Sequence, residues 1–134
     1  MWVARKFWPA WAEWVTFTLT IRRTAPGAAT LEGSIENHAW TGTPEHAAPP
    51  VTCDGDVLDV VVAQPAGGLY LSPTVSFNGT SWSVREHRCR AWQRYRLDHF
   101  TGALDPVRET LTTTNSDGGR DQEEPYVFRR VRCL

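Results

Sequence analysis

The stretch that decides the fold runs from Trp14 to Ile21 and reads WVTFTLTI. Apolar residues occupy its odd positions from Val15 onward, and threonines occupy the even positions between them. Side chains of a β-strand alternate between two faces, and β-branched residues favour extended backbone. The stretch therefore predicts a strand with one buried and one exposed face.

The same alternation recurs along the chain on both sides of short turns. After Ala25-Pro26-Gly27, residues 30–40 carry apolar residues and glycine on one parity and charged or polar residues on the other, which predicts the second arm of a hairpin. Further strand patterns cover residues 57–62, 69–77, 80–86, 91–100, 107–114 and 126–133. About eight short strands in sequence order predict an all-β antiparallel meander.

Turn residues set the expected connections. Gln64 to Gly68 contains proline and two glycines and predicts the end of a strand. Asn78-Gly79 between two alternating runs predicts a tight hairpin, because both central residues of such a turn need positive φ. Pro73 lies inside the first of these runs and predicts an edge or a bulge there.

Eight strands in this order can close into a barrel or split into a sandwich. We favour the barrel, because closure removes unpaired strand edges. This architecture resembles the calycin barrels, the lipocalin-like group, at the level of fold. The Gly-x-Trp motif that precedes the first strand in that group is absent, and Trp40 and Gly42 stand in the reverse order. The resemblance therefore implies a fold and no function.

The length of 134 residues, with 41% hydrophobic residues, predicts one domain. We divide it into a Trp-rich N-terminal segment, residues 1–13, and a single antiparallel β domain, residues 14–134. Pro9 suits the first turn of a short helix that would plug one end of the barrel. The alternative is a segment that docks on a protein partner or a membrane surface through Trp2, Trp8 and Trp11.

The charge balance argues against a nucleic-acid partner. Lys and Arg number 14 against 15 acidic residues, for a net charge of −1. The basic residues are nevertheless clustered, with five arginines between positions 85 and 96 and Glu86 as the only carboxylate among them. A local site for a small anion is therefore consistent with the sequence.

If residues 82–100 form one extended strand, this cluster forms a basic and aromatic face. Guanidinium groups bind carboxylates and phosphates and stack on rings, so the face predicts a site for an anionic or amphipathic small molecule. Its candidate ligand-binding residues are Arg88, Arg90, Trp92, Arg94, Tyr95 and Arg96. The alternative is that these arginines pair with carboxylates of neighbouring strands on a solvated surface.

The sequence predicts neither catalytic residues nor a metal or cofactor. His38, His46, His87 and His99 show no spacing typical of metal ligands. We therefore expect a non-enzymatic binding module for a small ligand or a protein partner. One alternative is a small barrel enzyme of the isomerase, cyclase or lyase type with Tyr95, His99 or Glu109 in its cavity. Another is an accessory subunit that docks in a larger complex through its N-terminal tryptophans.

Cysteine usage and the N-terminus bear on the compartment. Cys53, Cys89 and Cys133 are an odd number of widely spaced thiols, which predicts reduced cysteines inside the cell. The N-terminus lacks the uninterrupted apolar core of a secretory signal. The longest uncharged stretch is broken by prolines and glycines, which predicts no transmembrane segment. We expect a soluble protein of the cytoplasm, or of an organelle after removal of a transit peptide.

Overall fold

The computed structural model describes residues 1–118 and 124–131, and within these ranges it contains strands and no helix. The nine strands are β1 (Trp2–Trp8), β2 (Glu13–Arg23), β3 (Thr30–Thr41), β4 (Asp59–Leu71), β5 (Thr74–Gly79), β6 (Ser83–His87), β7 (His99–Asp105), β8 (Thr110–Asn115) and β9 (Pro125–Arg130).

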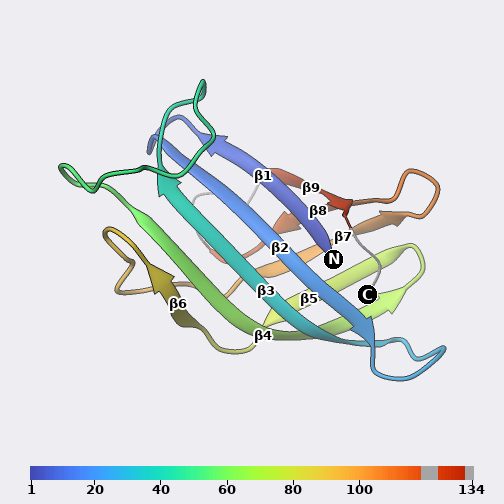
Figure 1. Ribbon diagram of the computed structural model, residues 1–134. Helices are drawn as coiled ribbons and strands as arrows, with labels where there is room; N and C mark the ends of the chain where they lie inside the picture. The colour runs from blue at the N-terminus through green and yellow to red at the C-terminus, as the bar shows by residue number, and fades with distance from the viewer. Residues whose placement is uncertain (119–123, 132–134) are drawn as a thin grey trace.

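Eight of these strands form a closed antiparallel barrel. Pairing runs β1-β2-β3-β4-β5-β7-β8-β9, and β9 returns to pair with β1. The remaining strand, β6, pairs with the first half of β4 and stays outside the ring (Figure 1). The expected all-β barrel is confirmed, whereas the narrower likeness to calycins stays a prediction.

The alternation of residues 14–21 directs its apolar parity into the barrel. Val15, Phe17 and Leu19 are buried there. The ring of Phe100 lies edge-on to Phe17, with centroids 5.0 Å apart, and to Phe128, with centroids 5.2 Å apart. Such contacts form an aromatic band, made of the buried rings of Phe17, Phe100, Tyr126 and Phe128. The middle of the barrel is therefore packed by side chains.

The prediction of an N-terminal helix is wrong, because residues 2–8 form β1. This strand pairs with β2 along its whole length, from Trp2 opposite Leu19 to Trp8 opposite Glu13. Its alternation places Ala4 and Trp8 in the buried interior. Pro9 lies in the turn that follows the strand. The Trp-rich segment therefore contributes one wall of the barrel.

The predicted hairpin at Asn78-Gly79 is also wrong. The turn lies earlier, at Ser72-Pro73, so that β4 continues through residues 64–68 and pairs there with β3 and, from Ala66 onward, with β5. Gly79 does not adopt positive φ. A Cβ on this residue would lie 2.1 Å from Oε1 of Gln64. A larger residue at this position would displace the side chain of Gln64, which is buried and hydrogen-bonded to Asp98.

The expected single strand over residues 82–100 is interrupted. Strand β6 ends at His87 and β7 begins at His99, so residues 88–98 form an irregular segment, which we call the end segment. Tyr95 of this segment packs against Trp82 and Trp92, with ring centroids 6.0 and 5.3 Å away. The continuous basic face predicted from parity therefore does not form.

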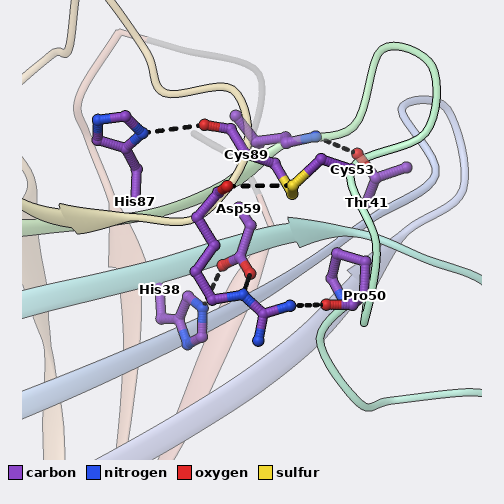
Figure 2. Close-up of a disulfide and its surroundings, with 9 residues drawn as sticks. His38, Thr41, Pro50, Cys53, Asp59, His87 and Cys89 are labelled. Carbon is purple, nitrogen blue, oxygen red and sulfur yellow. Dashed lines mark hydrogen bonds and ion pairs between the residues drawn. A yellow bond between two sulfur atoms is a disulfide. The ribbon is translucent and has the colours of Figure 1, made fainter.

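A disulfide joins Cys53 to Cys89, so the prediction of reduced cysteines is wrong for this pair. Cys133 lies outside the described residues. The bond ties the long β3–β4 connection to the start of the end segment, beside the pair of His38 and Asp59 (Figure 2). Disulfides persist mainly in oxidising compartments, so this bond does not favour the predicted intracellular location.

The part of the chain that the structure describes contains no helix that is long and apolar enough to cross a membrane.

Candidate functional site

Three strands direct a polar side chain into one end of the barrel. Asn37 on β3, Gln64 on β4 and Asn115 on β8 are buried, at 4%, 1% and 0% exposure. Each occupies the same inward parity as apolar residues earlier on its strand. Buried polar groups generally require hydrogen-bond partners. These three side chains therefore define a polar network inside a barrel whose buried side chains are mostly apolar.

The network converges on Asp98, the last residue of the end segment, which is 1% exposed. Its Oδ1 accepts a hydrogen bond from Nδ2 of Asn115 at 2.7 Å. Its Oδ2 accepts two more, from Nε2 of Gln64 and from the hydroxyl of Tyr95, each at 2.6 Å. Three donors thus hold the carboxylate and fix the end segment to the interior.

Burial has the largest effect on the pKa values of Asp98 and Tyr95. It raises the pKa of Asp98 from 3.8 to about 7, although the hydrogen bonds from Tyr95, Asn115 and Gln64 act in the opposite direction. Burial, followed by the charge of Asp98, raises the pKa of Tyr95 well above its ordinary value. Asp98 therefore loses its proton near neutral pH, whereas Tyr95 stays protonated there.

Asn37 extends the network to a pocket. Its Nδ2 donates a hydrogen bond to the hydroxyl of Tyr95 at 2.7 Å. Its Oδ1 is buried and has no hydrogen-bond partner among the described residues. An acceptor buried without a partner costs roughly 1–3 kcal/mol. This atom therefore marks a position where a donor from outside the network would stabilise the protein.

The pocket beside Asn37, which we call the end pocket, has a volume of about 220 Å³. This is below the roughly 300–1,000 Å³ typical of sites for drug-sized molecules, so the pocket suits a small molecule. Aromatic and apolar side chains form its walls, and polar and charged groups form the remainder. The lining residues are Trp8, Val15, Phe17, Asn37, Trp92, Arg94, Tyr95, Arg96, Asp98 and Asp117.

Two arginines of the end segment are exposed side chains that line the end pocket. Arg96 donates a hydrogen bond from a guanidinium nitrogen to the carbonyl of Gly118 at 3.1 Å. Arg94 forms no ion pair or hydrogen bond with the residues that the structure describes. The guanidinium of Arg94 is therefore available to an anion.

The six predicted ligand-binding residues separate into two groups. Trp92, Arg94, Tyr95 and Arg96 come together at the end pocket. Arg88 and Arg90 lie elsewhere and follow the alternative interpretation, in which arginines pair with carboxylates. Nε of Arg88 lies 3.6 Å from Asp59, and Nε of Arg90 lies 2.8 Å from Asp56.

The three tryptophans predicted to dock a partner have different environments. Trp8 is buried and lines the end pocket. Trp2 is partly buried at the opposite end of the barrel, where the guanidinium of Arg130 lies 5.9 Å from its ring. Trp11, in the turn between β1 and β2, is 47% exposed. A docking role for this group therefore rests on Trp11.

The residues proposed for an enzyme cavity are also dispersed. Tyr95 belongs to the polar network and lines the end pocket. His99 lies 3.2 Å from Oδ1 of Asn78, and Glu109 forms an ion pair of 3.5 Å with Arg130. Neither of these two lines the end pocket. Within the described ranges, no group of three side chains is suited to bind a metal ion.

Sequence reasoning missed Asn37 and Asp98 as pocket residues. Asn37 carried a usable signal, because it follows Leu31, Gly33 and Ile35 on the buried parity of its strand. A polar residue at an inward position requires either an internal partner or a ligand. Asp98 carried no such signal, since it lies in a segment without regular structure.

Comparisons with protein-family models, with curated proteins and with solved structures return no match. The chemistry of the end pocket itself therefore carries the functional argument.

Proposed function

We propose that this protein binds a small amphipathic molecule with an anionic group in the end pocket. The observation that carries the proposal is the guanidinium of Arg94, which has no partner among the described residues and lies at a pocket walled by aromatic rings. Arginine recognises carboxylates and phosphates through two parallel hydrogen bonds. The anionic group of the ligand therefore binds at Arg94.

The charges around the pocket orient this ligand. Asp98 is buried, and Asp117 also lines the pocket. An anionic group near these carboxylates would be repelled, whereas Arg94 and Arg96 are exposed at the pocket surface. The acid therefore faces solvent beside the arginines. The apolar part lies between the rings of Trp8, Phe17 and Trp92, where burial of apolar surface stabilises the complex.

The hydrogen bonding of Asp98 supports binding as the principal role of the site. All three donors around its carboxylate are protein groups, from Gln64, Asn115 and Tyr95. A carboxylate held in this way positions the end segment and the aromatic side chains that it carries. The pocket is thereby formed before a ligand arrives, which lowers the entropic cost of binding.

Substitution of Arg94 tests the proposal. The probes are para-methylbenzoate, para-methylphenylacetate and para-methylphenylpropanoate, which place a carboxylate at increasing distance from a ring. Isothermal titration calorimetry should show that Arg94→Gln weakens the tightest of these by roughly tenfold to a hundredfold, because a charged hydrogen bond contributes roughly 1.5–3 kcal/mol.

Arg90→Gln is the matched control, since Arg90 pairs with Asp56 away from the pocket. Its affinity for the probes should equal that of the unsubstituted protein. An equal loss in the two variants, or no binding at millimolar concentration of any of these acids or of their para-hydroxy counterparts, would show that the proposal is wrong.

Acid–base catalysis is the second candidate function, favoured by the pKa of about 7 of Asp98 at the pocket wall. In this case the protein should accelerate the exchange of the methylene protons of phenylpyruvate in D2O, followed by NMR. Asp98→Asn should abolish the acceleration, and Asp56→Asn should retain it. Exchange at the buffer rate in the presence of the protein excludes this candidate for the probe class.

A further inference from the structure

The unpaired Oδ1 of Asn37 specifies the ligand more closely than the arginine does. Asn37 is 4% exposed and lines the end pocket. Its Oδ1 is one of two buried side-chain polar atoms without a hydrogen-bond partner among the described residues. The other is Nε1 of Trp40, which is not a lining atom of this pocket. The unpaired acceptor therefore belongs to a side chain that lines the proposed binding site.

The neighbouring hydrogen bonds fix which end of the Asn37 amide is already paired and which end is not. Tyr95 donates its only hydroxyl proton to Asp98, at 2.6 Å. The oxygen of Tyr95 must then accept the bond from Asn37, so the NH₂ group of Asn37 is directed to Tyr95 at 2.7 Å. Oδ1 is the remaining polar atom of this side chain. The network thus leaves one hydrogen-bond acceptor without a partner on a side chain that lines the pocket.

We propose that the ligand donates an N–H or O–H hydrogen bond to Oδ1 of Asn37. The ligand class is then a ring acid with a hydroxyl or amino group on the side of the ring opposite its acid. The acid binds Arg94, the ring lies against Trp8 and Trp92, and the donor reaches Asn37. This inference rests on the proposed function and adds the polarity of the ligand's buried end.

Selectivity follows from the same atom. A site built to hydrogen-bond a hydroxyl rejects an analogue without it, because the buried protein group is then left unpaired. A methyl group in place of the hydroxyl is similar in size and fills the same space. The two analogues therefore differ mainly in their ability to donate to Asn37.

Matched pairs of probes test the inference. Each methyl-substituted acid named above is compared with its hydroxyl counterpart, namely para-hydroxybenzoate, para-hydroxyphenylacetate and para-hydroxyphenylpropanoate. In the unsubstituted protein, calorimetry should show at least one hydroxyl acid binding roughly tenfold more tightly than its methyl partner. Asn37→Leu should reduce this ratio to about one while retaining the methyl acid. Asn78→Leu, which alters an asparagine outside the pocket, should leave the ratio unchanged.

The outcomes separate this inference from the proposed function. Hydroxyl and methyl acids that bind equally well to the unsubstituted protein, in an Arg94-dependent manner, overturn the inference and leave the proposed function standing. A preference for the hydroxyl acid that persists in Asn37→Leu also overturns it. If neither member of any pair binds, both proposals are wrong. A ratio of about one in the unsubstituted protein overturns the inference even if Asn37→Leu fails to fold.

Discussion

The two ends of the barrel differ in chemistry although the same strands build both. One end holds the polar network around Asp98 and the end pocket of about 220 Å³. The opposite end holds a pocket of about 130 Å³ lined mostly by apolar side chains, among them Ile21, Leu31, Val75 and Leu104. The alternation of the strands sets which positions face inward. The side chains at those positions decide which end is polar and which end is apolar.

The aromatic band lies between these two ends. Phe17 belongs both to this band and to the wall of the end pocket. Burial of rings in edge-to-face contact stabilises the barrel by the removal of apolar surface from water and by the ring geometry. The aromatic band therefore stabilises both ends of the barrel, whereas the polar network stabilises only the end that holds Asp98.

The largest expected effect on stability comes from a substitution in the aromatic band. Phe100→Ala removes a ring that is 1% exposed and contacts Phe17, Tyr126 and Phe128. We expect the free energy of unfolding in urea to fall by about 3–5 kcal/mol, because the substitution leaves a cavity. Val107→Ala, at a residue 91% exposed, should change it by less than about 0.5 kcal/mol. Similar losses in both variants would contradict the role of the band.

The second-largest expected effect is a pH-dependent change in stability, which should arise from Asp98 at the polar end of the barrel. The folded state raises the pKa of Asp98 from 3.8 to about 7, so it binds the proton more tightly than the unfolded chain does. The contribution of Asp98 to stability is therefore complete below pH 4 and is lost as the pH rises to about 7. The upper limit of this loss is about 4 kcal/mol.

Urea unfolding at a series of pH values measures this dependence. Asp98→Asn should remove the decline between pH 4 and 7, because the amide does not titrate. The groups that face Asp98 are Tyr95, Gln64 and Asn115, with the charge of Asp117 acting in addition. An unchanged decline in the variant would assign it to other carboxylates.

The smallest effect is expected at the rim of the apolar end. Nε of Arg22 lies 2.9 Å from Oε1 of Glu32, and both side chains are largely exposed. Arg22→Gln should cost about 0.2–1 kcal/mol of stability and less in high salt, because exposed ion pairs are screened. Thermal melts at two salt concentrations measure this. Binding of the ring acids should be unaltered, and a change in it would weaken the distinction between the ends.

Sequence alternation predicted much of the barrel because alternation reports directly on burial. Residues 14–21 and 30–40 were placed correctly in β2 and β3. Glycine and proline were less informative, since each has several structural uses. Gly79 was interpreted as a turn residue, whereas it lies at the end of β5 and packs closely against the side chain of Gln64. Pro73 was assigned to an edge or a bulge and lies in the β4–β5 turn.

The site was only partly predictable because it depends on pairing between distant segments. Trp92, Arg94, Tyr95 and Arg96 were identified by their composition and meet at one pocket. Arg88 and Arg90 belong to the same arginine-rich stretch. They form ion pairs with Asp59 and Asp56 and do not line the end pocket. The disulfide was missed for the same reason, since cysteine spacing does not reveal which thiols approach each other in space.

The disulfide between Cys53 and Cys89 has a topological consequence, because the covalent loop that it closes contains the whole of β4, β5 and β6. A single cut of the backbone anywhere inside that loop, for example at the turn between β4 and β5, leaves two pieces that remain one molecule. Each wall of the barrel keeps its neighbours and the end segment keeps its anchor. The cross-link therefore keeps this part of the molecule covalently attached after a backbone cleavage, and a new pair of chain ends could be placed there without releasing any strand.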